Sequence, residues 1–183
     1  EDLGTGSAFG FSVGKYLTDS FRLELEAIKR TGYDFDVNVS TAGFTQFSEK
    51  AKIQTEALFI NGFYDFQPFT MSNTAITPYL GGGVGISRNK MGTDVLHTSG
   101  LPSGFTIDGN TINQFAYKLS AGTLVSLTEQ LSLDLNYQYV NLGAFKGGTG
   151  VLFNGASPGT LTRGTNGGDI KSQELMVGLQ YKF

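Results

Sequence analysis

The segment "ELMVGLQYKF", residues 174–183, ends the chain with a nearly regular alternation of apolar and polar or small residues. A period of two is typical of a β-strand that has one apolar and one polar face. The apolar face would carry Leu175, Val177, Leu179, Tyr181 and Phe183. The fold therefore depends on whether such a face packs in a soluble core or meets the hydrocarbon of a membrane.

The same alternation recurs along the chain and predicts an antiparallel all-β fold. It is clearest in "LSLDLNYQYV", where Leu131, Leu133 and Leu135 alternate with polar residues. A helix would distribute both sets around its circumference, so the pattern favours strands. The seven predicted strands cover residues 7–15, 21–39, 51–64, 76–90, 113–127, 131–140 and 174–183.

The connections between these strands alternate in length. Short turns are expected near residues 17–19, 65–75 and 128–130, and long polar segments near 40–49, 91–112 and 143–169. Compact soluble domains seldom carry three such loops, whereas outer-membrane barrels combine short periplasmic turns with long external loops. The pattern favours a single up-and-down barrel domain over residues 1–183, with the three long segments outside the cell.

Composition and charge exclude several functional classes. The absence of cysteine excludes disulfides, thiolate metal sites and cysteine nucleophiles, and the net charge of -3 without a basic patch argues against a nucleic-acid partner. No run of about 18 apolar residues is present, which excludes a transmembrane helix. The first residue is not Met and no signal peptide is visible, so we interpret the sequence as a mature or trimmed chain.

Aromatic residues on the apolar faces fall into two groups along the strands. Two aromatic girdles flanking an aliphatic band indicate a membrane-facing surface. The group expected near the short turns is Phe21, Phe63, Tyr181 and Phe183, and the group expected near the long loops is Tyr33, Phe115, Tyr117, Tyr137 and Tyr139.

The opposite faces combine charged residues with glycines and suit the interior of a narrow barrel. A barrel of about eight strands has room only for its own side chains, and buried charges are tolerated when they are paired. We therefore expect a plug of charged side chains instead of an open pore. The expected lumen residues are Arg22, Glu24, Glu26, Lys52, Glu56, Lys118, Asp134 and Glu174.

Hairpin parity predicts the first turn. For Val13 and Leu23 to share a face, the turn must hold an odd number of residues. A three-residue turn, 17–19, would place Tyr16 opposite Ser20 and Gly14 opposite Arg22.

Four segments resemble the opacity-type and surface-antigen family of small bacterial outer-membrane barrels: "FGFSVGKYLTDSFRLELEA", "INGFYDF", "TPYLGGGVGIS" and "GLQYKF". The resemblance implies an eight-stranded barrel whose external loops act as antigens, adhesins or shields. It also implies that Leu179, Tyr181 and Phe183 form the terminal signal that the barrel-assembly machinery reads during insertion.

The odd number of predicted strands departs from that family. Bacterial single-chain barrels normally have an even number of strands, and a lipid-exposed edge would leave backbone groups without hydrogen bonds. We expect an eighth strand to seal the edge between residues 7–15 and 174–183, supplied by an upstream segment or, as an alternative, by a partner chain.

No motif in the sequence points to catalysis or to a cofactor. His97 is the only histidine and falls in a long loop, and "GGGVG" at 81–85 lacks the helix and GK[ST] of a phosphate loop. The spacing of Asp34, Asp36 and Asn38 suggests calcium, but Val39 and Thr45 occupy positions where an EF-hand requires Gly and Glu. The neighbouring Glu24 and Glu26, flanked by Arg22, suit an ion-pair network.

The sequence thus predicts a non-catalytic barrel that displays loops on the surface of a Gram-negative cell. Outer-membrane lipid surrounds it, and host or cell-surface ligands would meet its loops. Two alternatives stay open: a porin for ions or small solutes, if the charged plug moves, and a soluble barrel that binds an apolar ligand.

Overall fold

The computed structural model describes residues 6–39, 47–92, 94–97, 103–107, 109–146, 148, 150–154, 157–161 and 168–183. Side chains are described for residues 6–32, 53–92, 109–146, 148 and 168–183. No helix within these ranges is long and apolar enough to cross a membrane.

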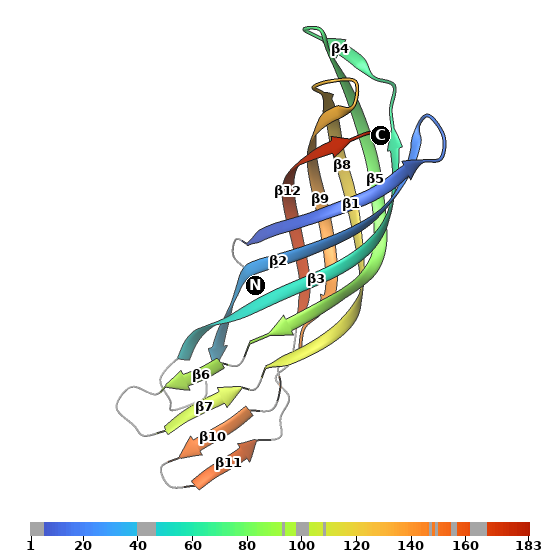
Figure 1. The fold of residues 1–183 in the computed structure, drawn as a ribbon. Helices are drawn as coiled ribbons and strands as arrows, with labels where there is room; N and C mark the ends of the chain where they lie inside the picture. Colours follow the sequence, from blue (N-terminus) through green and yellow to red (C-terminus); the bar gives the residue numbers. More distant parts are fainter. Residues whose placement is uncertain are drawn as a thin grey trace.

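Seven long strands form one curved antiparallel sheet in the order β1-β2-β3-β5-β8-β9-β12 (Figure 1). Each pairs with its neighbour along the chain, which is the up-and-down topology that the alternating turns predict. Their bounds are β1 (Ser7–Tyr16), β2 (Phe21–Val39), β3 (Phe47–Asp65), β5 (Thr74–Met91), β8 (Asn110–Ser126), β9 (Leu131–Ala144) and β12 (Asp169–Tyr181), and the short β4 (Phe69–Met71) pairs with β5.

A second sheet lies within the segments that were expected to be long loops. Its four strands have the order β11-β10-β7-β6, with bounds β6 (Asp94–His97), β7 (Ser103–Ile107), β10 (Gly150–Asn154) and β11 (Ser157–Leu161). Pairing between these strands provides partners for the backbone N–H and C=O groups of the segments. Sequence alternation alone did not predict this second sheet.

Two of the turns at the opposite end of the main sheet repeat one structure. In the first, Thr18 Oγ1 accepts hydrogen bonds from the amides of Ser20 (3.3 Å) and Phe21 (3.0 Å). In the turn before β9, Thr128 Oγ1 accepts from the amides of Gln130 (3.3 Å) and Leu131 (3.0 Å). With this turn structure, the register of the first hairpin differs from the predicted one.

Strands β1 and β2 pair with Tyr16 opposite Arg22 and Gly14 opposite Glu24. The expectation of a three-residue turn with Gly14 opposite Arg22 is wrong. Five residues, 17–21, lie between the paired Tyr16 and Arg22, and five is also odd, so Val13 and Leu23 keep their common face.

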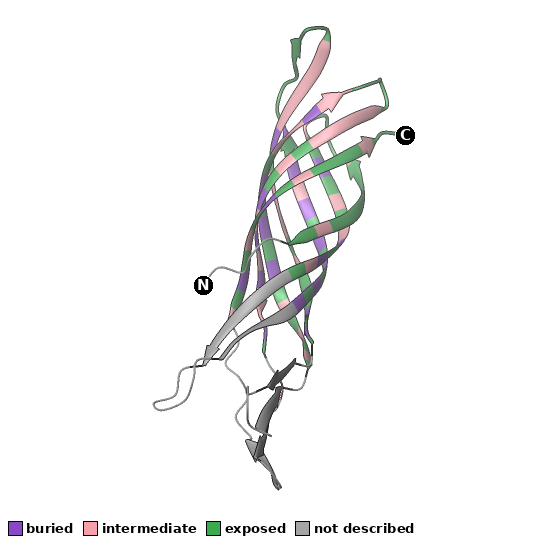
Figure 2. Cartoon of the chain, turned by 90° about the vertical axis from the view of Figure 1, so that its left-hand side faces the viewer, coloured by how far each residue is buried: buried purple, intermediate pink, exposed green. Residues whose placement is uncertain are grey.

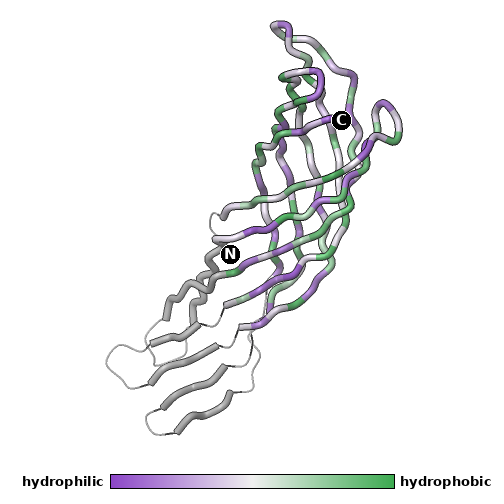
Figure 3. Tube along the Cα trace, viewed as in Figure 1, coloured by the Kyte–Doolittle hydropathy of each residue, from purple (hydrophilic) through white to green (hydrophobic). Residues whose placement is uncertain are grey.

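Burial and hydropathy both vary from residue to residue along the strands of the main sheet (Figures 2 and 3). The exposed, outer face is largely apolar, and the inner face holds buried polar and apolar residues. Ile86 and Val177 on the outer face are 64% and 67% exposed, whereas Tyr79 and Arg30 on the inner face are buried. A bulge in β2 between Arg30 and Tyr33 shifts the register with β3 by one residue. The side chain of Tyr33, expected in the girdle, lies outside the described residues.

The two edges of the main sheet, β1 and β12, are not hydrogen-bonded to each other. The seven strands therefore form an open, barrel-like wall, and its concave side contains the groups described next.

Candidate functional site

Arg22 organises a rim network, formed by Tyr16, Arg22, Glu24 and Asp65, at the short-turn end of the lumen. Its Nε donates to Asp65 Oδ1 (3.1 Å), and it forms an ion pair with Glu24. Tyr16 donates its hydroxyl hydrogen to Asp65 (2.7 Å). The guanidinium also lies 4.2 Å from the ring centroid of Phe63, so one cation joins the polar and aromatic parts of this end.

A central network crosses the lumen further along the strands. Arg30 donates from Nε and Nη2 to Glu174 (2.7 and 3.1 Å), which joins β2 to β12 across the interior. Gln138 donates to the same carboxylate (2.7 Å), and Lys118 donates to Gln138 (3.2 Å) and forms an ion pair with Glu26. The members of the central network are Glu26, Arg30, Asn61, Lys118, Gln138 and Glu174.

An apolar layer lies on the inner face toward the long-loop end. On β9 the inward residues change from Gln138 to Val140 and Leu142, both of which are fully buried. On β12 the change is from Glu174 to Ile170. The apolar layer consists of Ile28, Ile53, Ala57, Phe59, Met91, Ala116, Val140, Leu142, Phe145 and Ile170.

Glycines on neighbouring strands make room for the large inward side chains. Gly85 pairs directly with Phe59, and a Cβ atom on this glycine would lie 2.9 Å from Phe59 Cδ1. A narrow barrel cannot hold two large inward side chains at one paired position. The same arrangement joins Asn61 to Gly83, Phe63 to Gly81 and Tyr79 to Gly122.

The charged residues expected in the lumen separate into three groups. Arg22, Glu24, Glu26, Lys118, Asp134 and Glu174 lie on the inner face, where Asp134 accepts a hydrogen bond from Tyr79 (2.7 Å). Glu56 does not: its side chain is 56% exposed on the outer face and pairs with Lys29 at 3.4 Å. The side chain of Lys52 lies outside the described residues.

Phe63 is also misplaced by the sequence-based prediction. It is 4% exposed and lies in the lumen beside Arg22, whereas its neighbour Tyr64 is exposed. The reason is that β3 is apolar on both faces, since its outer Leu58 and Ile60 alternate with inner Phe59 and Phe63. The other expected girdle residues with described side chains are all at least partly exposed, and Phe183 lies just beyond the end of β12. They are Phe21, Phe115, Tyr117, Tyr137, Tyr139, Tyr181 and Phe183.

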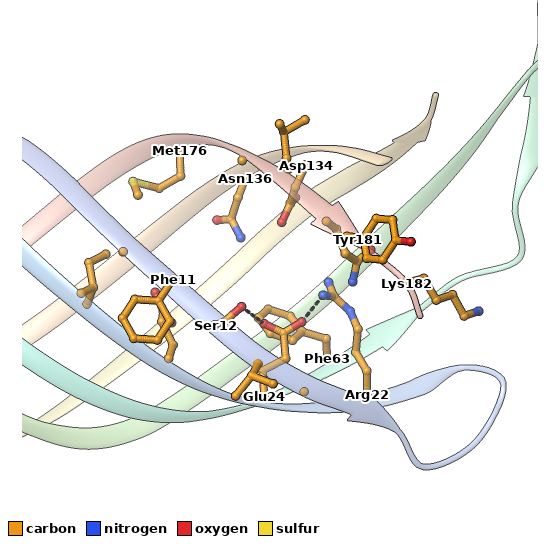
Figure 4. A pocket seen from close by; sticks show the side chains of 18 of the residues that line it. Phe11, Ser12, Arg22, Glu24, Phe63, Asp134, Asn136, Met176, Tyr181 and Lys182 are labelled. Atoms are coloured by element: carbon orange, nitrogen blue, oxygen red, sulfur yellow. Dashed lines mark hydrogen bonds and ion pairs between the residues drawn. The ribbon is translucent and has the colours of Figure 1, made fainter. Parts of the chain in front are cut away.

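A cavity of about 620 Å³ opens along the unpaired edges of β1 and β12. Figure 4 shows Ser12 and Glu24 on one side of it and Asp134 and Asn136 on the other, with a 2.9 Å hydrogen bond from Ser12 to Glu24. Asn136 Oδ1 and Arg22 Nη2 are buried and have no hydrogen-bond partner among the described residues. Polar residues of the lumen therefore line the cavity at the open edge, and two of their buried atoms are left without a hydrogen-bond partner.

The metal and catalytic hypotheses gain no support from the described side chains. No group of three or more His, Cys, Asp or Glu suited to a metal ion occurs among them. The side chains of His97, Asp34, Asp36 and Asn38 lie outside the described residues.

A comparison with family models matches residues 1–183 to the outer membrane protein beta-barrel domain. The chain belongs to this family. It is accordingly a β-barrel protein of the bacterial outer membrane. No solved structure is detectably similar to it.

Named relatives share about a quarter or more of the aligned sequence. The outer membrane protein PagN of Salmonella typhimurium is 27% identical over 146 residues, which are 76% of this chain and 57% of PagN. A protein of Rickettsia bellii named as a candidate adhesin is 29% identical over 181 residues, covering 92% of this chain and 72% of the relative. A similarly named protein of Rickettsia prowazekii is 29% identical over 176 residues, covering 92% and 71%.

Sequence reasoning missed several residues of the lumen. Arg30 has the same parity as Arg22 and Glu26, so the alternation of β2 could have identified it. Asp65 and Tyr16 are the last residues of their strands. The alternation stops there, so it does not assign them to a face. Gln138 and Asn61 are uncharged, and a search for charged residues passes over them.

The central network generates a prediction about stability. Arg30→Met or Glu174→Leu alone should reduce the free energy of unfolding by roughly 3–5 kcal/mol, because each leaves a buried charge without its partner. The double variant should lose clearly less than the sum. The free energy of unfolding of the wild type, the two single variants and the double variant can be measured by urea unfolding in detergent. Heat-modifiable mobility on gels reports the folded fraction.

The outer pair provides a matched control for the cycle. Lys29→Met and Glu56→Leu should each change the free energy of unfolding by less than about 1 kcal/mol, because exposed ion pairs contribute little. Additive losses in the Arg30 and Glu174 cycle would show that this pair is not coupled.

Proposed function

We propose that this protein is a plugged outer-membrane barrel that presents its long-loop end to the outside and binds host or other cell surfaces there. The names of the Rickettsia relatives support an adhesin role. The contrast between the two ends supports the orientation, because one end has threonine-centred turns of five residues and the other carries a separate four-stranded sheet. The proposal assigns the protein no catalytic step and no cofactor.

Side-chain packing on the inner face, apart from the cavity at the edges of β1 and β12, supports display over transport. Successive layers, the rim network, the central network and the apolar layer, occupy the concave side of the wall. Arg30 is fully buried and bonded across the lumen, so a passage for ions would require a buried ion pair to separate.

Conductance tests the plug. Purified protein in planar bilayers should give no large, steady single-channel currents. Phe59→Ala combined with Phe145→Ala should raise the leak, because both side chains belong to the apolar layer, whereas Phe21→Ala on the outer face should not. Steady currents from the wild-type protein would support the porin alternative instead.

Adhesion tests the display role. Replacing residues 93–108, which include β6 and β7, with a short Gly-Ser linker should reduce the binding of expressing bacteria to host cells several-fold while the barrel stays folded. Replacing residues 127–130 at the other end is the matched control and should leave binding unchanged. Equal binding by both variants would contradict the adhesin proposal.

We further propose that one additional strand of the complete protein, upstream of residue 1, closes the gap between β1 and β12. A membrane offers no hydrogen bonds to an open edge. The cavity at this edge supports the proposal, since Arg22 Nη2 lacks an acceptor there and Asn136 Oδ1 lacks a donor. Leu179, Tyr181 and Phe183 are on or beside the same edge, where the assembly machinery would recognise them.

Cysteine pairs test the closure in protein isolated from membranes. Val13→Cys and Leu25→Cys are directly paired and should form a disulfide. Val13→Cys with Val177→Cys should not, because an intervening strand separates β1 from β12 by roughly 9–10 Å. Rapid bridging of Phe9, Phe11 or Val13 positions to Leu175, Val177 or Leu179 positions would show that β1 and β12 pair directly.

A further inference from the structure

The outer face of the wall changes from apolar to polar at a definite point on each strand. On β5 the outward residues Leu80, Val84 and Ile86 are followed by Arg88 and Lys90, toward the long-loop end. The change marks the edge of the hydrocarbon-facing band. The corresponding outward residues just beyond it on other strands are Lys29 on β2, Glu56 and Gln54 on β3, Asn113 and Thr111 on β8, and Gln173 and Lys171 on β12.

Four of the charged side chains that the structure describes beyond this boundary are already paired. Lys29 pairs with Glu56 at 3.4 Å, and Lys171 pairs with Asp169 at 3.3 Å. Arg88 and Lys90 differ, because among the described side chains neither forms an ion pair or a hydrogen bond. Two unpaired cations therefore lie together on one exposed strand face.

The surroundings of these cations offer further hydrogen-bonding groups. Arg88 pairs in register with Glu56 and Asn113, and Lys90 pairs with Gln54 and Thr111. The side chains of Gln54, Asn113 and Thr111 are exposed on the same face. We call Arg88, Lys90, Gln54, Asn113 and Thr111 the cationic patch.

We propose that the cationic patch binds the phosphate groups of a membrane lipid headgroup in the leaflet that meets the long-loop end. Arg88 and Lys90 are two residues apart on one face, about 6.6 Å along the strand, so both can reach one phosphate or two phosphates of one headgroup. Arginine binds phosphate through two parallel hydrogen bonds, and amide and hydroxyl groups supply more donors. Ile86, next along the strand, would contact the acyl chains of the same lipid.

A lipid fits this patch better than a soluble anion does. The patch lies at the edge of the apolar band, where headgroups are anchored and their phosphates are concentrated. Its position does not depend on which loops bind a host surface, so failure of the adhesin proposal and failure of this one are distinguishable.

Native mass spectrometry of the complete protein in detergent tests the proposal. The probe is a lipid with a diphosphorylated sugar headgroup, compared with the same lipid after removal of its phosphates. The wild-type protein should prefer the phosphorylated lipid. Arg88→Gln with Lys90→Gln should weaken its binding roughly 25-fold, since each cation near a lipid surface contributes about fivefold.

Lys15→Gln with Lys182→Gln is the matched control, because it removes the same charge at the short-turn end. This control should retain binding, and Arg88→Lys with Lys90→Arg should retain most of it. Glu56→Gln should strengthen binding, because it removes the carboxylate opposite Arg88. Heat-modifiable mobility verifies that each variant is folded.

Several results would overturn the proposal. Unchanged binding by the Arg88 and Lys90 variant, an equal loss in the Lys15 and Lys182 control, or equal affinity for the dephosphorylated lipid would each exclude a phosphate site at the patch. Displacement of the lipid by millimolar inorganic phosphate alone would assign the patch to a free anion instead of a lipid headgroup.

Discussion

The hydrogen bonds of the backbone dominate this structure, because hydrocarbon offers no substitute for a missing partner. Each residue of a membrane-crossing strand must donate and accept within the sheet. The antiparallel ladder from β1 to β12 meets this requirement along its whole width except at its two outer edges. The short turns follow the same rule, since the hydroxyls of Thr18 and Thr128 accept hydrogen bonds from turn amides that have no strand partner.

Once the ladder is formed, the two faces of each strand face different surroundings. The outer face needs only apolar side chains of moderate size, whereas the inner face must fill a narrow space without voids or unpaired charges. The direct pairing of Phe59 with Gly85 and of Tyr79 with Gly122 shows how this space is shared. The glycines at these paired inward positions are therefore a packing requirement of the lumen.

Alternation in the sequence was sufficient to predict the seven strands and the inward position of Arg22, Glu24 and Glu26. It failed for Glu56 and Phe63, because parity assigns a face only where one face is polar, and β3 is apolar on both. The small sheet formed by β6, β7, β10 and β11 was not predicted either, since short strands in polar segments have too few residues to show a period. The turn at 17–21 was misjudged by two residues because a side-chain hydroxyl, not strand parity, determines its length.

From the short turns to the long loops, polar and apolar side chains follow one another in opposite order on the two faces of the wall. On the inner face, polar networks lie toward the short turns and the apolar layer lies toward the long loops. On the outer face, the apolar band gives way to Arg88, Lys90 and Gln173 toward the same long-loop end. Near that end the wall is thus mainly apolar inside and polar outside, the reverse of its middle part, where ion pairs lie within and aliphatic residues lie on the outer face. In the orientation that we propose, with the long-loop end outside the cell, this reversal would let packed side chains on the inner face support the long-loop sheet above the membrane surface.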